Sequence, residues 1–276
     1  MVRAVPARGD HPPAASERAG IVLSALNRRG RERFSGTLRL DGSPGGTVVM
    51  RNGLVAAATT PAAPGPEPLL LRSGRVSEAD WTAAFSAGAP DGRFADELVR
   101  RGLLGSAGVE VVTQTAVVDA LFAMVLCGVH TCTAGPEGTP PPLPADPGLA
   151  PERLAREITR RLAMADGWQA RGLTMASRPR ATHARETTPL NRSRREILDR
   201  ANGRRTPRDI AFALGRGVYS VLTDLATLVE DGLAALDPPP AEARVTAPSS
   251  VPAGPVPVPT GPDGSIRRRG TAYPGE

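Results

Sequence analysis

The chain has 276 residues, enough for one or two domains with linkers, and its formal net charge is +6. Two cysteines are too few for a disulfide scaffold, and the longest apolar window, residues 116–129, is too short to span a bilayer and contains Asp119. Because the N-terminal stretch lacks the apolar core of a secretory signal, we expect a soluble cytoplasmic protein.

The positive charge is unevenly distributed along the chain. All 34 basic residues are arginine, which matches the coding bias of a GC-rich genome and is therefore weak evidence for a function. Residues 1–167 contain 18 arginines and 17 acids, whereas residues 168–236 contain 12 arginines and 7 acids. The positive field is therefore expected in the last third of the ordered chain.

The first elements are predicted by apolar spacing and turn residues. Residues 1–15 are rich in Pro, Ala and Arg and are expected to be disordered, and a first helix is expected from Ser16 to Gly30. Alternating apolar residues over 34–40 predict a strand. The Asn52-Gly53 pair predicts a hairpin closed by a type I′ turn, because both residues tolerate positive φ.

A Leu-x-Arg-x-Gly phrase occurs twice, 28 residues apart. Leu70, Arg72 and Gly74 recur as Leu98, Arg100 and Gly102. Each unit predicts a short helix, a glycine that reverses the chain, an apolar pair and a second helix, and the last of these helices is expected over 106–127. The two units are expected to pack against each other. Arginine is the repeated residue that such packing does not require.

The middle of the chain is predicted to alternate between regular and irregular structure. A strand is possible after Cys127, and residues 61–68 and the Pro-rich end of 127–148 are expected to be loops. Pro151 suits the first turn of a helix whose apolar face has a helical period, with Glu157–Arg161 and Glu152–Arg156 as i,i+4 pairs. Residues 168–189 lack periodicity and are predicted to be a linker.

Residues 190–236 follow a helix-turn-helix pattern. Ser193 with Glu196, and Thr206 with Asp209, predict capped helix starts. A Gly-Arg-Gly break at 215–217 precedes a helix over 218–230, and a single short strand is possible at 232–236. The remaining tail, residues 237–276, is expected to be disordered.

This segment admits two functional interpretations. In the first, the last helix enters the major groove of DNA and arginines around it contact phosphate. The candidate DNA contacts are Arg204, Arg205, Arg208, Arg216, Tyr219, Ser220 and Thr223. Against it, residues 217–236 contain no arginine and three acids, and no wing hairpin is evident. In the second, the segment is a protein-interaction or dimerisation module of the same shape.

Catalytic and metal-binding patterns are not evident in the sequence. The chain has no nucleophile-elbow motif, no phosphate-binding glycine loop and no paired-carboxylate signature. Cys127, His130 and Cys132 are too few for a structural zinc site, which needs about four ligands. The sequence therefore predicts a protein that is not an enzyme and that holds no cofactor or metal.

Three segments resemble known families. The segment FSGTLRLDG…GTVVMRNGLVAAAT resembles the PATAN-type (DUF4388) domain of bacterial regulatory proteins, and the two repeats resemble the N-terminal domain of pilus and type II secretion ATPases. Residues 195–234 resemble a winged-helix-like domain found at the C-terminus of actinobacterial-type PATAN proteins. The candidate ligand or partner contacts are Arg72, Arg93 and Arg100: the resemblance implies Arg93, which matches the first motif residue, and the repeat implies Arg72 and Arg100, which its packing does not require. Some members of the secretion-ATPase N-terminal domain family bind cyclic di-GMP through these repeat motifs. Here Gly65 replaces the motif arginine of the first copy and Ala95 replaces the motif glycine of the second, which argues against that ligand.

Together these features predict an α+β protein with a β-hairpin or sheet and a helical repeat domain, followed by an all-α winged-helix-like domain. The expected divisions are 1–15 disordered, 16–167 PATAN-like with repeats at 69–85 and 97–113, 168–189 linker, 190–236 winged-helix-like and 237–276 tail. The expected function is a non-enzymatic bacterial regulator of transcription that binds DNA. The alternatives are a signalling adaptor that binds a protein partner or itself, or a cyclic di-GMP sensor. No membrane partner is expected.

Overall fold

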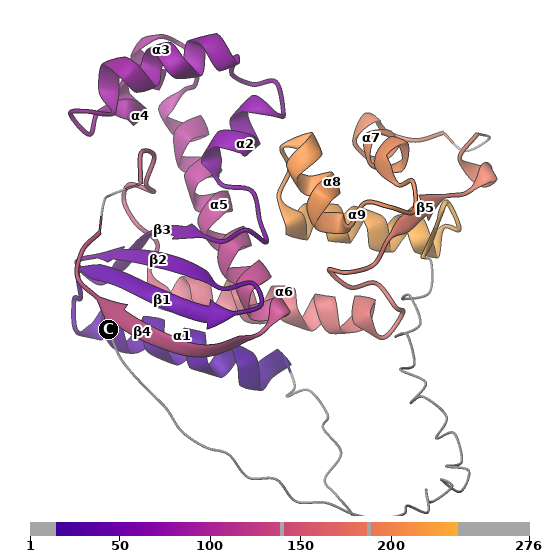
Figure 1. The fold of residues 1–276 in the computed structure, drawn as a ribbon, viewed down its shortest axis with the longest axis horizontal. Coiled ribbons are helices and arrows are strands. Elements are labelled where there is room, and N and C mark those ends of the chain that lie inside the picture. The colour runs from indigo at the N-terminus through magenta and orange to yellow at the C-terminus, as the bar shows by residue number, and fades with distance from the viewer. Residues whose placement is uncertain (1–14, 139–140, 187–188, 237–276) are drawn as a thin grey trace, which may run out of the picture. The chain divides into compact units, whose positions relative to one another are not determined.

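The computed structural model describes residues 15–138, 141–186 and 189–236, and all of them belong to one compact unit. The expectations for residues 1–14 and for the tail from Asp237 lie outside the described residues. The fold is mixed α+β, as predicted, with a four-stranded antiparallel sheet and a separate two-stranded sheet (Figure 1).

The four-stranded sheet has the strand order β3-β2-β1-β4. Its strands are β1 (Gly36–Gly42), β2 (Gly46–Arg51), β3 (Leu54–Thr59) and β4 (Val129–Gly135), so the strand predicted after Cys127 is confirmed as a partner of β1. Asn52 and Gly53 have φ values of 49° and 80°, which confirms the predicted hairpin turn. Leu38 and Leu40 are buried while Arg39 is exposed, so one face of β1 is directed to the core.

Helix α5 (Ser106–Cys127) is central to the fold. Every side chain from Ala116 to Leu126 is buried, against the sheet, against α1 (Ala15–Arg31) and against α6 (Pro151–Gln169). Contrary to the prediction from residues 116–129, α5 is long and apolar enough to cross a membrane. However, 78% of its most apolar window is buried inside the fold, a pattern that the core helix of a soluble protein also shows.

Three short helices precede α5: α2 (Pro66–Leu71), α3 (Glu78–Gly88) and α4 (Phe94–Arg100). Residues 61–68 are therefore not entirely a loop, because α2 begins at Pro66. After α2 and after α4 the chain reverses at a glycine of positive φ, 72° at Gly74 and 68° at Gly102. The hydrogen bonds that close the two turns are equivalent, with Leu70 O and Leu98 O each accepting from the residue five positions later.

The C-terminal helices are bracketed by two short strands. They are α7 (Arg192–Arg200), α8 (Pro207–Leu214) and α9 (Val218–Glu230), and strands β5 (Pro179–Ala181) and β6 (Ala234–Leu236) pair antiparallel. The predicted short strand is thus confirmed as β6, but its partner lies in the segment that was expected to be a linker. Within that segment Trp168 and Leu173 are also buried in the main core.

The helix caps differ from prediction at one of two positions. Thr206 and Asp209 form the predicted capping box at α8. At α7 the predicted Ser193–Glu196 box is wrong, because Asn191 is the N-cap and its side chain accepts a 2.9 Å hydrogen bond from Arg194 N. Glu196 instead pairs with Arg192 at 2.8 Å. Asparagine caps helices about as well as serine does, so both positions were competent and the structure uses Asn191.

Candidate interaction site at the junction of α5 and α9

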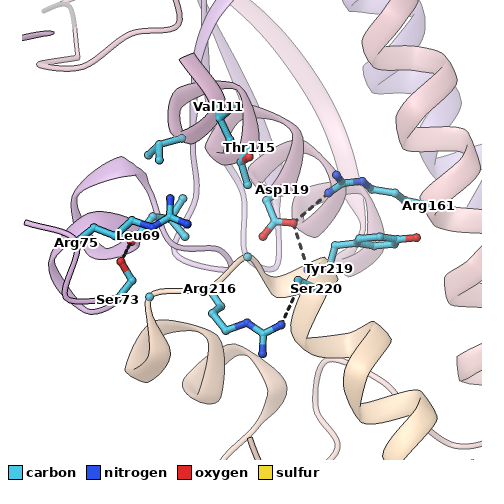
Figure 2. A pocket seen from close by; sticks show the side chains of 13 residues that line it. Leu69, Ser73, Arg75, Val111, Thr115, Asp119, Arg161, Arg216, Tyr219 and Ser220 are labelled. Atoms are coloured by element: carbon cyan, nitrogen blue, oxygen red, sulfur yellow. Dashed lines mark hydrogen bonds and ion pairs between the residues drawn. The ribbon is translucent and has the colours of Figure 1, made fainter. Parts of the chain in front are cut away.

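Asp119 is buried in the middle of α5, where its neighbours in sequence are apolar. Its carboxylate accepts hydrogen bonds from the backbone N–H groups of Val218 and Tyr219, the latter at 3.1 Å. Helix α9 begins after Gly217, which has no side chain to cap it. Asp119 therefore provides from α5 the cap that α9 lacks, as Figure 2 shows.

Arg161 of α6 forms an ion pair with the buried carboxylate of Asp119. Its Nη1 lies 3.1 Å from Asp119 Oδ1, and its Nε donates to Glu157 Oε1 at 2.7 Å. Burial raises the pKa of Asp119, while Arg161 and the two amides of α9 act in the opposite direction. Hydrogen bonds from Arg160 and Arg161 lower the pKa of Glu157 to about 2. The junction is thus a linked set of charges from α5, α6 and α9.

Tyr219 anchors the first turn of α9 in an aromatic cluster. Its ring meets Phe122 edge to face with centroids 5.3 Å apart, and it lies 5.5 Å from the ring of Trp168. The Arg161 guanidinium lies over the ring at 4.3 Å from its centroid. The Tyr219 ring therefore packs against side chains of α5 and α6.

Glycines allow the α8–α9 turn to approach α2 and α5 closely. Gly215 has a φ of 60°, and a Cβ there would lie 2.7 Å from Pro68 O and 2.9 Å from the carbonyl carbon of Arg72. A Cβ at Gly217 would lie 3.0 Å from Asp119 Oδ2. The predicted break at 215–217 is confirmed, and it also forms a tight contact with the turn that follows α2.

The residues predicted to contact DNA bases are differently placed. Tyr219 faces α5 and α6, whereas Ser220 and Thr223 are exposed on α9. Thr223 Oγ1 donates to Tyr219 O within the same helix at 2.9 Å. Arg216 Nη2 lies 2.7 Å from both Ser220 Oγ and Asp224 Oδ2, so its charge is paired on α9 itself.

The arginines predicted to contact phosphate fall into two groups. Arg204 and Arg205 are exposed between α7 and α8. Arg208, although exposed, donates to Pro61 O and lies over the ring of Phe212 at 5.1 Å. Arg208 therefore ties α8 to the loop before α2, as Arg216 is tied to α9.

The three arginines predicted to contact a ligand or partner do not have equivalent surroundings. Arg93 pairs with Asp91 and Arg100 with Glu97, each at 2.6 Å, on the exposed surface near α4. Arg72 is exposed and lines a hollow together with Phe212 of α8. Arg72 and Arg100 are equivalent in sequence, but Gly215 of the α8–α9 turn lies against the turn that contains Arg72, whereas a Cβ at Gly102, in the turn after Arg100, would meet nothing within 4 Å.

A hollow of about 430 Å³ opens beside the α5–α9 junction. Asp119 and Tyr219 line it with Arg75, Arg161 and Arg216, which approach from three different elements (Figure 2). Sequence reasoning did not identify Asp119, Arg161 or Arg75 as site residues. For Asp119 the signal was an isolated acid in an apolar stretch, which indicates a buried partner somewhere in the fold but does not say which one.

In the described part of the chain, no three His, Cys, Asp or Glu side chains gather closely enough to hold a metal ion. No protein-family model matches the chain, and no curated protein or solved structure matches it significantly.

Proposed function

We propose that the protein is a non-enzymatic regulator that acts through contacts with another protein or a second copy of itself, and not by reading DNA. The observation that carries this proposal is the capping of α9 by Asp119. A helix-turn-helix protein reads bases with the N-terminal residues of its second helix. Here the amides of that end bind a buried carboxylate, and Tyr219 lies in an aromatic cluster.

The charge of α9 supports the same proposal. The segment 217–236 contains no arginine, and its three acids are Asp224, Glu230 and Asp231. Such a helix would repel phosphates and lacks the side chain that most often reads guanine. A docking helix that contacts protein needs neither property.

The C-terminal helices and the two glycine turns are each interpreted as a unit of the fold. We infer that α7, α8 and α9 with β5 and β6 form a winged-helix-like module, and that the two Gly-turn units around α2 and α4 form a repeated pair. The support is the strand pair that brackets the three helices and the equivalent hydrogen bonds of the two turns. The winged-helix-like module would then pack against the first Gly-turn unit, because Gly215 contacts the turn that follows α2.

A second candidate function is a DNA-binding regulator whose C-terminal helices must first leave α5. Arg195, Arg204 and Arg205 favour it, because they are exposed and no ion pair joins them to another described residue. They could contact phosphate without the first turn of α9, although base reading would still require release of that turn.

The experiment measures binding of the full chain to random duplex DNA at low salt, for the wild type and for Asp119→Ala. Our proposal predicts that neither binds. Binding by the wild type that weakens steeply with salt would overturn it. Binding by Asp119→Ala alone would establish the second candidate, a DNA binder held inactive by docking.

A positive readout uses the tagged full chain purified from the cells that express it, with nuclease treatment. We expect a stoichiometric protein complex or a homo-oligomer, with its mass measured by light scattering. A monomer recovered without protein, or a complex that nuclease dissolves, contradicts the proposal.

A further inference from the structure

A second hollow, of about 400 Å³, lies between α5 and α6 and adjoins the first. The two adjoining hollows share the lining residues Thr115 and Arg161, and we call the two together the arginine groove. Six arginines and two acids line it, a formal charge of +4. The arginines are Arg75, Arg153, Arg156, Arg160, Arg161 and Arg216, and the acids are Asp119 and Glu157.

Half of these arginines have no carboxylate partner in the described part of the fold. Arg160 and Arg161 both bind Glu157, and Arg216 binds Asp224. Arg75, Arg153 and Arg156 are exposed, and no ion pair joins them to another described residue. The sequence predicted a Glu152–Arg156 pair, but only the Glu157–Arg161 pair forms. Three guanidinium groups, one in the first hollow and two in the second, are thus available to a ligand.

We propose that the arginine groove binds an acidic segment of a partner protein, in which carboxylates alternate with apolar residues. This inference rests on the proposed function and names the chemistry of the partner. The planar guanidinium of arginine matches a carboxylate in a two-point hydrogen-bonded pair. Val111, which is 60% exposed, and Leu69 and Val118 provide apolar wall between the charges.

Nucleic acid fits the groove less well. Single strands bind by stacking bases on aromatic side chains as well as by charge. Tyr219 is the aromatic residue among those that line the groove, and its ring is already engaged by Phe122, Trp168 and Arg161. Duplex DNA is read by an element that protrudes into its groove, and here the basic surface is concave and contains two carboxylates.

The test is fluorescence anisotropy with the full chain and a labelled peptide in which glutamates alternate with leucines. The groove variant is Arg75→Gln, Arg153→Gln and Arg156→Gln combined. The matched control removes the same charge from exposed arginines elsewhere: Arg28→Gln, Arg31→Gln and Arg39→Gln. Thermal melting of both variants checks that the fold is retained, and a glutamine-for-glutamate peptide checks the need for carboxylates.

We expect salt-dependent binding of the acidic peptide, weakened about tenfold or more by the groove variant because several charge-assisted contacts are lost, and weakened less than about threefold by the control. Equal loss in both variants, or no binding by the wild type, overturns the inference. So does single-stranded DNA that displaces the peptide at lower concentration and is itself lost in the groove variant.

These outcomes are separable from failure of the proposed function. If a nuclease-resistant partner still purifies with the groove variant, the groove inference is wrong and the proposed function stands. If duplex DNA binds the wild type, the proposed function is wrong whatever the peptide does.

Discussion

Asp119 in α5 and Tyr219 in α9 are one hundred residues apart in sequence, and the carboxylate of the first accepts a 3.1 Å hydrogen bond from the backbone N–H of the second. The bond joins α5, which packs against the four-stranded sheet, to the first turn of α9. Asp119 thus occupies the backbone N–H groups that this turn would otherwise offer to another molecule.

Replacing Asp119 should weaken the whole fold, because its two acceptor oxygens satisfy three buried or half-buried donors. We expect Asp119→Asn to lower the free energy of unfolding by about 1–3 kcal/mol and Asp119→Ala by about 3 kcal/mol or more. Urea denaturation measures both. The exposed Glu110→Gln on the same helix is the control, and an Asp119→Ala protein as stable as that control would contradict the assignment.

Gly215 should tolerate a methyl group much less than Gly102 does. Both have positive φ, 60° and 68°, so alanine at either position incurs a backbone cost of about 1–2 kcal/mol. A Cβ at Gly102 meets open space, whereas at Gly215 it meets the backbone of Pro68 and Arg72. We expect Gly215→Ala to cost at least about 1 kcal/mol more than Gly102→Ala, from overpacking. Equal melting temperatures for the two variants would mean that the turn does not contact α2 closely.

Glu157 should make part of the stability depend on pH. Its pKa falls from the ordinary 4.5 to about 2 in the folded protein, because Arg160 and Arg161 donate to it. A depressed folded-state pKa adds stability above pH 4.5, and that stability is lost as the pH falls from about 4.5 to about 2. Glu157→Gln should therefore flatten the stability profile over this range, as measured by urea denaturation at successive pH values.

The control for this prediction is Glu152→Gln. Glu152 lies on the same helix, is exposed and forms no ion pair with another described residue. Its replacement should leave the slope of the acid limb unchanged. The same flattening in both variants would show that the slope reflects general charge and not the pair with Arg161.

Local chemistry determined which elements the sequence predicted well. The hairpin at Asn52-Gly53 and the cap at Thr206 depend on residues within a few positions of each other, so the pattern was sufficient. At α7 two competent caps, Asn191 and Ser193, lie close together, and composition could not choose between them.

The rest of the site depends on contacts that are distant in sequence. Strand β5 has three residues and exists because β6 pairs with it more than fifty residues later. From the sequence, Asp119 was only evidence against a membrane-spanning segment, because no residue near it in the chain indicates a partner on α9. The two copies of the Leu-x-Arg-x-Gly phrase look alike, but Gly215 packs against the first, while a Cβ at Gly102 of the second would meet nothing within 4 Å.

Hydrogen exchange at the backbone amides of Val218 and Tyr219 tests the docking of α9 most directly. The amides of Ala107 and Gly108 provide the comparison, because they lie in the first turn of α5, whose N-cap Gly105 has no side chain. We expect Val218 and Tyr219 to exchange far more slowly than Ala107 and Gly108 in the wild type, and Asp119→Ala to remove the difference. Exchange of all four amides at a similar fast rate in the wild type would contradict that docking.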